Sequence, residues 1–366
     1  MNSRAKSQSA SLAETLLWLL RVPSHTGDER GIADALEARL QHAPIAQRVR
    51  RYGHSLVVPW TRVPGAPHVL LCGHTDTVRT ENGTPRIEGD RIYGSGSSDM
   101  KSGLALMFEL ITACTPHVSV SLVFYASEEG PFVANELGRV LAEDAEVASA
   151  DYAVCLEPSD NVLQLGCCGS LHATVQFSGR TGHSARPWEA ESAVLKAAPL
   201  LARLAALAPI EHVVDGLTFR TVTSVTRAND GGRGRNVVPD SFTLNLNHRF
   251  APGTSIEQAC ADVEALVAGE GSVQFTDKSP SAMPHAAHPF TQALVAAGAK
   301  GVERKQAWTD VARFGLAGIA AVNFGPGINA QAHQANEFTS LALLVDGFDI
   351  FRNWLAALPK STHGQI

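Results

Sequence analysis

Short apolar runs that end in turn residues recur along the chain, and they predict buried strands. The four runs begin at His68 (HVLLCG), Ser121 (SLVFYAS), Asp151 (DYAVCLEP) and Ile319 (IAAVNFGPG). Continuous rather than alternating apolarity is typical of strands that helices cover on both faces of a mostly parallel sheet. Helical spacing lies between these runs, as in GDERGIADALEARL, where apolar residues recur four positions apart. The predicted fold class is therefore α/β, with a mostly parallel sheet flanked by helices.

The middle of the chain follows a different pattern. LHATVQF from Leu171 and SFTLNLNHRF from Ser241 alternate apolar and polar residues, which predicts antiparallel strands with one face in water. One helix is expected over about 191–207, and another begins in a capping box at Ser255 and Gln258. These elements predict an α+β lid and dimerisation domain, residues 169–283, inserted into a discontinuous catalytic domain of residues 1–168 and 284–366.

The start of the chain is polar for ten residues. SLAE at Ser11 to Glu14 then has the form of a capping box and precedes an amphipathic pattern. We therefore expect the first helix to begin at Ser11 and to end before Pro23.

Composition excludes several classes of function. The 366 residues are 45% hydrophobic and 18% charged, with a formal net charge of −6 and no stripe of Lys and Arg, which argues against a nucleic-acid partner. LLWLL after Glu14 is too short for a signal sequence or a membrane span. None of the six cysteines forms a CxxC pair, so reduced thiols are expected. We expect a cytoplasmic protein with no membrane and no nucleic-acid partner.

Acidic residues and histidines follow the predicted strands. They are His74 and Asp76 in GHTDTV, Asp99 in GSGSSDMKSG, Glu128 and Glu129 in ASEEG, Glu157 in CLEPSD and His333 in QAHQANE. Ligands of open α/β sheets bind beyond the carboxyl ends of the strands. Two histidines and several carboxylates at one rim make a mixed nitrogen and oxygen site for Zn²⁺ or a similar divalent ion.

The adjacent carboxylates Glu128 and Glu129 raise a geometric question, because neighbours on a strand face opposite sides. Past a strand end the chain can turn, so that both face one crevice, one as a metal ligand and the other as a proton carrier. His74 and Asp76 are two positions apart and therefore share a face, which suits a ligand histidine oriented by a carboxylate.

Taken singly, these residues have ordinary structural explanations. Asp99 alone is most simply an N-cap, and a lone pair of glutamates is usually a solvated turn. GSGSSDMKS is not a phosphate loop, because Met100 stands where that loop needs glycine. Their common position at strand ends favours the metal site over a set of coincidences.

Six motifs, GHTDTV, GSGSSDMKSG, SEEG, EPSD, GHSA and HQANE, occur in this order over nearly the whole chain. Together they resemble the dinuclear zinc amidohydrolase and peptidase family, which includes succinyl-diaminopimelate desuccinylase, acetylornithine deacetylase, aminoacylase and carboxypeptidase G. The segments GHSARPWEAESAVLKAAPLLARLA and KQAWTDVARF are most similar to desuccinylases of the actinobacterial type.

The resemblance implies a role for each matching residue. Asp99 would bridge two zinc ions, with His74 and Glu157 completing one position and Glu129 and His333 the other. Glu128 would be the general base, Asp76 would support His74, and His183 would reach across a dimer to the partner's substrate carbonyl. The implied substrate contacts are Asn236, Arg249, Arg313 and Asn336.

The implied activity is metal-dependent hydrolysis of the amide bond of a small N-acyl amino acid. Two Zn²⁺ ions, for which Co²⁺ or Mn²⁺ substitute, would activate water while Glu128 moves its proton. N-succinyl-LL-2,6-diaminopimelate, in lysine biosynthesis, is the first expectation for the substrate, and the enzyme is expected to be a homodimer through the inserted domain. Acetylornithine deacetylation and carboxypeptidase- or dipeptidase-like cleavage are alternatives, and a catalytically inactive dimeric binding module is the alternative from another class.

Two departures from the family pattern bear on the substrate. Cys167 and Cys168 stand where well-studied desuccinylases carry arginine, and serines fill the stretch before Asp99 where the family often has Arg or Thr. The loss of the arginines removes charge that would hold a substrate carboxylate, so the acyl group is left open.

Overall fold

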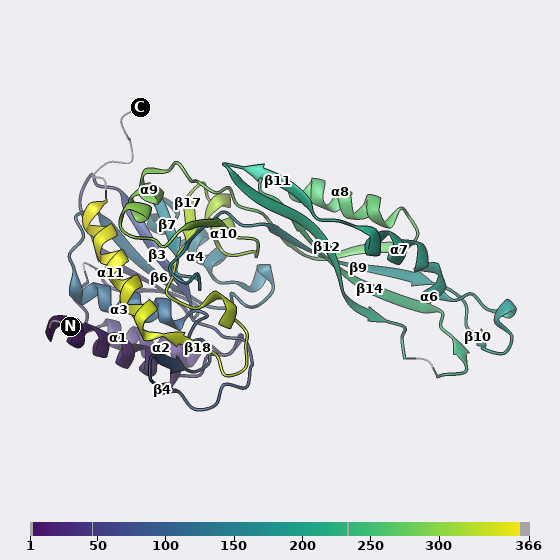
Figure 1. Cartoon of the computed structure of the whole chain (residues 1–366), viewed down its shortest axis with the longest axis horizontal. Coiled ribbons are helices and arrows are strands. Elements are labelled where there is room, and N and C mark those ends of the chain that lie inside the picture. The colour runs from purple at the N-terminus through teal and green to yellow at the C-terminus, as the bar shows by residue number, and fades with distance from the viewer. Residues whose placement is uncertain (1–2, 46, 233, 359–366) are drawn as a thin grey trace. The chain divides into compact units, whose positions relative to one another are not determined.

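The structure, a computed structural model, describes residues 3–45, 47–232 and 234–358 (Figure 1). It consists of two compact units. Unit 1 comprises Met1–Gly166, Pro284–Lys305 and Arg313–Ile366, and unit 2 comprises Cys167–Met283 and Gln306–Ala312. No helix among the described residues combines the length and the apolar character that a bilayer crossing needs.

Unit 1 is built on an eight-stranded sheet of order β1-β2-β6-β3-β7-β17-β8-β16. The strands are β1 Arg50–Tyr52, β2 Ser55–Thr61, β3 His68–His74, β6 Ser119–Tyr125, β7 Tyr152–Cys155, β8 Leu163–Leu165, β16 Val302–Arg304 and β17 Ala320–Asn323. The four central strands β6, β3, β7 and β17 run parallel, and all of β6 and β7 is buried. The predicted α/β class with a mostly parallel, helix-covered sheet is confirmed.

Helices cover this sheet, and a small antiparallel sheet of order β18-β5-β4 accompanies it. The helices are α1 Ser3–Leu20, α2 Arg30–Leu40, α3 Lys101–Ala113, α4 Leu137–Glu143, α5 Ala145–Ala148, α9 Pro289–Ala296, α10 Val311–Leu316 and α11 Leu341–Ala357, and the small sheet comprises β4 Arg86–Glu88, β5 Arg91–Tyr93 and β18 Phe338–Ser340. Helix α3 is buried from Lys101 to Ile111 because it packs against β3, α1 and α11. This burial explains its almost continuous apolar sequence.

Helix α1 begins at Ser3, so the prediction of a start at Ser11 is wrong. The Ser11 hydroxyl does not cap the helix but donates to Glu109 Oε2 at 2.6 Å, and Thr15 donates to Glu109 Oε1 at 2.7 Å. Both hydroxyls therefore tie α1 to α3, and the polar residues before Ser11 extend the helix.

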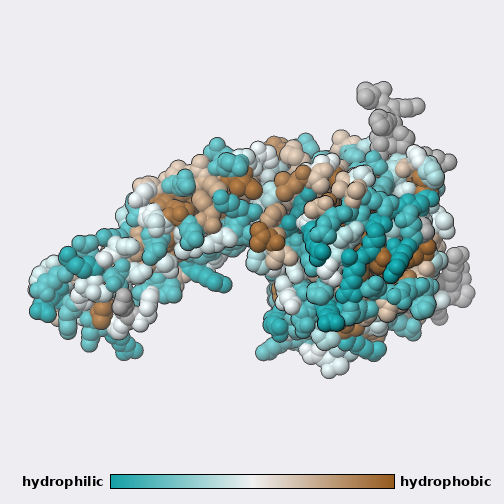
Figure 2. Space-filling model, turned by 180° about the vertical axis from the view of Figure 1, so that it is seen from behind, coloured by the Kyte–Doolittle hydropathy of each residue, from teal (hydrophilic) through white to brown (hydrophobic). Residues whose placement is uncertain are grey.

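Unit 2 contains a five-stranded antiparallel sheet of order β11-β12-β14-β9-β15. Its elements are β9 Gly169–Ser178, β10 Gly182–His183, α6 Ala193–Lys196, α7 Ala198–Ala206, β11 Ile210–Val214, β12 Leu217–Asn229, β13 Val237–Val238, β14 Ser241–Phe250, α8 Ile256–Val267 and β15 Ser272–Ser279. One face packs on α6, α7 and α8, so alternate residues of β14 are buried, as the sequence predicts. On the side of unit 2 seen in Figure 2, apolar side chains lie in separate groups among polar ones.

The segment Gln306–Ala312 joins unit 2 although it lies far along the chain from the rest of that unit. The Gln306 side chain accepts from Arg220 N at 3.2 Å and donates to Arg220 O at 2.6 Å. Trp308 Nε1 donates to Pro280 O at 3.0 Å. Unit 2 is therefore formed from two separate stretches of chain.

The loop after β17 lies so close to the loop after β7 that only glycine fits at Gly325. A Cβ there would lie 2.4 Å from Leu156 O and 2.6 Å from Glu157 O. We predict that Gly325→Ala lowers the free energy of unfolding by roughly 1–3 kcal/mol through overpacking, seen by calorimetry as a lower Tm.

The control for this variant is Gly315→Ala. Gly315 lies in α10, and a Cβ there meets nothing within 4 Å, so alanine should be neutral or slightly stabilising. Equal Tm values for the two variants would show that the close approach at Gly325 does not constrain the fold.

Candidate metal centre

The four parallel central strands bring the predicted residues to one rim of the sheet. His74 is the last residue of β3, Glu128 and Glu129 follow the end of β6 at Tyr125, and Glu157 follows the end of β7 at Cys155. Because these strands are parallel neighbours, their carboxyl ends lie together, where α/β sheets bind ligands.

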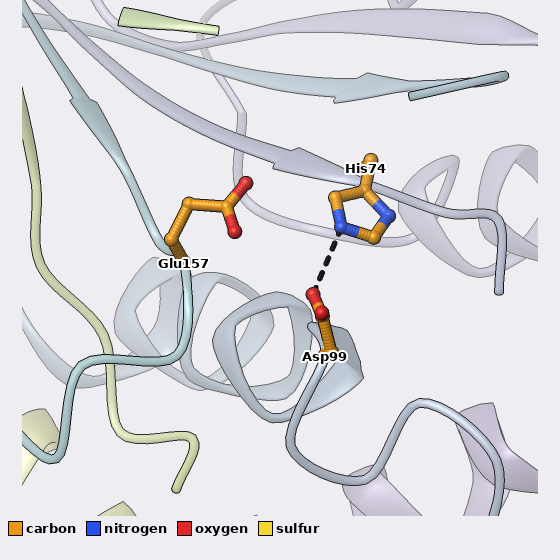
Figure 3. A group of neighbouring side chains, drawn as sticks. All are labelled: His74, Asp99 and Glu157. Carbon is orange, nitrogen blue, oxygen red and sulfur yellow. Dashed lines mark hydrogen bonds and ion pairs between the residues drawn. The ribbon is translucent and has the colours of Figure 1, made fainter. Parts of the chain in front are cut away.

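A first group of possible ligands is buried at this rim. His74, Asp99 and Glu157 are 1%, 9% and 5% exposed, and each offers a ligand atom within 4.8 Å of the others. His74 Nε2 lies 3.2 Å from Asp99 Oδ1, and the Glu157 carboxylate is directed toward the same space (Figure 3). Asp99 follows the glycine- and serine-rich loop, and its peptide bond to Met100 is cis.

A second group shares Asp99 with the first. Asp99, Glu129 and His333 also offer ligand atoms within 4.8 Å of one another. His333 Nε2 lies 2.8 Å from Glu129 Oε1 and 3.5 Å from Asp99 Oδ2. His333 sits in a loop with a left-handed backbone (φ 61°) and its side chain is 53% exposed, in contrast to the buried His74. The structure thus brings all five predicted metal ligands together, with Asp99 common to both groups.

The chain turns immediately after β6, and this turn places both adjacent glutamates at the site. Ser127 adopts a left-handed conformation (φ 63°), and its hydroxyl donates to Glu29 Oε1 at 3.0 Å. Glu128 and Glu129 then form a third group with His74, again within 4.8 Å. The turn removes the strand alternation that would otherwise separate the two side chains.

Asp76 supports this turn more directly than it supports His74. Its fully buried carboxylate accepts the backbone N–H groups of Glu128 at 3.0 Å and Glu129 at 3.1 Å, and the Thr26 hydroxyl at 3.0 Å. His74 Nδ1 lies 3.0 Å from the backbone oxygen of Asp76 but 3.6 Å from Oδ1 of its side chain. Asp76 therefore orients His74 through its backbone and positions both glutamates through its side chain.

The electrostatics of the rim favour bound cations. Burial alone would lower the pKa of His74, but the nearby carboxylates of Asp76, Asp99 and Glu128 raise it well above its usual value. The hydrogen bond to Glu129 raises the pKa of His333 to about 9. Carboxylates crowded in this way repel one another unless positive charge is supplied. Imidazole nitrogens with carboxylate oxygens are donors suited to Zn²⁺, Co²⁺ or Mn²⁺, so the residues fit divalent metal.

Two further buried ionisable side chains, Glu337 and Lys305, act on Asp99, and neither is among the predicted site residues. Glu337, at the end of the HQANE motif, accepts three backbone N–H groups from the loop before and at Asp99. Burial raises its pKa to about 7, against the opposing effect of these N–H groups. Lys305 is 7% exposed, and its charge helps to lower the pKa of Asp99 against the effect of burial. Neither the residue type of Glu337 nor its spacing in HQANE indicates that it is buried, so the sequence offered no signal for this role.

The two expected substrate contacts of unit 1 lie in different settings. The Arg313 side chain is 7% exposed, lies 3.8 Å over the Phe132 ring and donates to Phe132 O. It thus holds the segment that follows Glu128 and Glu129. Asn336 is exposed, has a left-handed backbone (φ 54°) and donates its N–H to Glu81 O at 3.0 Å.

In unit 2 the structure brings His183 and Asn236 together and separates both from Arg249. His183, on β10, pairs with Val237 on β13, and Ser184 N donates to Asn236 O at 2.9 Å. Arg249 pairs with Ser170 at the other end of β9, where its Nε donates to Asn247 Oδ1 at 2.9 Å. The eight steps along β9 from Ser170 to Ser178 span roughly 26 Å at about 3.3 Å per residue.

Cys167 and Cys168 are both fully buried in unit 2. Burial raises the pKa of Cys167 to about 12, and its Sγ faces Thr309 O at 3.7 Å. The effect of these cysteines on the substrate stays a prediction.

Comparison with known proteins agrees with this geometry. The family model Peptidase family M20/M25/M40 matches residues 70–357. A putative succinyl-diaminopimelate desuccinylase DapE of Mycobacterium tuberculosis is 36% identical over 340 residues, covering 92% of this chain and 96% of that protein. A succinyl-diaminopimelate desuccinylase of Corynebacterium glutamicum is 33% identical over 349 residues, covering 92% and 94%.

Solved structures share the fold. An M20 family metallo-carboxypeptidase from Sulfolobus solfataricus superposes with a TM-score of 0.76 at 16% identity, covering 94% of this chain and 98% of that one. The aminopeptidase PepT from Bacillus cereus gives 0.75 at 21% identity, covering 95% and 98%. The family model spans most of the chain, and the relatives match it over nearly their full length. The rim also carries groups of possible metal ligands. The chain therefore belongs to peptidase family M20/M25/M40 and is a hydrolase.

Proposed function

We propose that this hydrolase is a two-metal deacylase that converts N-succinyl-LL-2,6-diaminopimelate to succinate and LL-diaminopimelate. The observation that carries the proposal is the pair of ligand groups that share Asp99 at the rim of the sheet. Relatives named as desuccinylases, at 36% and 33% identity over nearly their full length, support the choice of substrate. The role in lysine biosynthesis and the cytoplasmic location belong to the same proposal.

In this proposal two Zn²⁺ ions would be held by the two groups that share Asp99, one with His74 and Glu157 and the other with Glu129 and His333. The ions, when bound, polarise the scissile carbonyl and lower the pKa of water. Glu128 accepts a proton from the attacking water while the water oxygen bonds to the carbonyl carbon. Glu128 then returns that proton to the amine nitrogen as the carbon–nitrogen bond breaks. The second proton of the water stays on the new carboxyl group and passes to the amine, so that the products are a carboxylate and an ammonium group. The Asp76 carboxylate holds Glu128 in place by accepting the backbone N–H group of Glu128.

The placement of His183 and Arg249 supports a homodimer that assembles through unit 2. Both are proposed to contact substrate, yet Arg249 pairs with Ser170 near the start of β9, whereas His183 lies on β10, beyond the Ser178 end of β9. The stretch of β9 from Ser170 to Ser178 alone spans roughly 26 Å. No single N-acyl amino acid spans that distance. His183 therefore acts on the substrate of a second copy, where it stabilises the negative charge that develops on the carbonyl oxygen.

Glu128 and Glu129 should respond differently to the same substitution. Glu128→Gln removes the proton carrier and should lower kcat by about 10²–10⁴-fold while zinc content is unchanged. Glu129→Gln removes a ligand and should lower zinc content as well as activity. Metal analysis and steady-state kinetics measure both effects. Substantial activity in Glu128→Gln would contradict its role as the base.

Kinetics on three substrate classes test the acyl group. We expect kcat/KM for N-succinyl-LL-2,6-diaminopimelate to exceed that for acetylornithine and short peptides by at least about tenfold, or ~1.4 kcal/mol. A preference of that size for acetylornithine would overturn the substrate assignment. Bound zinc with no release of amine from any acyl amino acid, assayed with ninhydrin, would favour the inactive binding module.

Mixing two inactive variants tests the dimer. His183→Ala and Glu128→Gln should each be inactive as pure proteins, but subunit exchange between equal amounts makes mixed dimers with one complete site. Activity should return to about one quarter of the wild-type value, because about half of the dimers are mixed. Mixtures that stay inactive after proven exchange would show that His183 does not act across the dimer.

A further inference from the structure

Glu337 is a buried acid that binds backbone rather than a cationic side chain. It is 3% exposed. Its Oε1 accepts Ser98 N at 2.7 Å and Asp99 N at 2.9 Å, and its Oε2 accepts Gly96 N at 2.8 Å. Successive backbone N–H groups aimed at one carboxylate form an anion-binding concavity. The loop that carries Asp99 is thereby wrapped around a side chain that lies more than 200 residues away in sequence.

The backbone of Glu337 is fixed to the same region. Its N–H donates to Asn82 Oδ1 at 2.7 Å, and its carbonyl accepts Gly94 N at 3.1 Å. Glu337 therefore contacts the Asp99 loop with both its side chain and its main chain. Because His333 lies only four residues earlier, Glu337 also fixes the end of the His333 loop.

The two ligand groups depend on this connection to different extents. His74 and Glu157 are buried residues that end or directly follow central strands of the sheet. His333 is half exposed and comes from a loop with left-handed residues at both His333 and Asn336. Only the group of Asp99, Glu129 and His333 draws two of its members from segments that Glu337 fastens together.

We propose that Glu337 is a positioning residue that holds Asp99 and His333 at their mutual spacing, and so sets the occupancy of the metal position formed by Asp99, Glu129 and His333. The proposal rests on the two-metal function proposed above. Loss of the Glu337 carboxylate leaves buried N–H groups unsatisfied, which releases the loop. The position formed by His74, Asp99 and Glu157 keeps His74, at the end of β3, and Glu157, which follows β7. Metal binding there is therefore weakened less.

The test is calorimetric titration of metal-free protein with Zn²⁺ at pH 8, using wild type, Glu337→Gln and Glu337→Ala. Wild type should bind two ions. In Glu337→Gln the amide oxygen can still accept some of the N–H groups, so the second ion should bind about tenfold more weakly, with a larger loss in Glu337→Ala. The first ion should bind within a few-fold of wild type in both variants. If Glu337→Ala does not fold, Glu337→Gln alone decides.

Asp144→Asn is a control for the loss of a buried carboxylate elsewhere in the fold. Asp144 is 4% exposed, accepts the backbone N–H groups of Glu146 and Val147 at 3.1 Å each at the start of α5, and also pairs with Arg50 Nε at 2.7 Å. This variant should lower Tm yet bind two ions normally. Equal weakening of both ions in Glu337→Gln, or no weakening, would overturn the proposal. A wild type that binds fewer than two ions would instead refute the two-metal function itself.

Discussion

The carboxylates of Asp99, Glu128, Glu129 and Glu157 meet at one rim because β6 and β7, which precede three of them, run parallel on either side of β3 in one sheet. Their mutual repulsion is the constraint on which the site depends, since four negative charges in a partly buried space need positive charge nearby. The negative charge of these carboxylates acts on the histidines, since the hydrogen bond to Glu129 raises the pKa of His333. Divalent cations satisfy the same need and also supply the chemistry of amide hydrolysis.

Two loops reach their positions by the same physical device. Asp76 accepts the N–H groups of Glu128 and Glu129, and Glu337 accepts those of Gly96, Ser98 and Asp99. In both cases a buried acid satisfies several nearby backbone donors that no strand or helix would satisfy. Main-chain hydrogen bonds therefore position Asp99, Glu128 and Glu129 at the rim without using their own side chains.

Much of the fold followed from hydrophobic pattern. The continuous apolar runs at His68 and Ser121 are central strands, and the alternating run at Ser241 is an antiparallel strand with one buried face. The start of α1 was mispredicted, because a cap motif at Ser11 does not reveal that its hydroxyl bonds to Glu109. Local pattern contains no information on such distant partners.

The same limit applies at the site. Position at strand ends pointed to His74 and Glu157, and the structure brings them together. The contact of Glu337 with the Asp99 loop and the stacking of Arg313 on Phe132 join segments far apart in sequence. Neither residue type nor spacing indicates these contacts. They follow only from the folded chain.

The return of Gln306–Ala312 to unit 2 bears on how this fold can be shortened. A chain that joined Gly166 directly to Pro284 would keep residues 306–312 but delete Arg220 and Pro280, to which Gln306 and Trp308 bond. Polar groups and an indole ring would then be exposed beside α10. A shortened enzyme without unit 2 would therefore also require redesign of residues 306–312, so unit 2 cannot be removed by deleting one continuous segment.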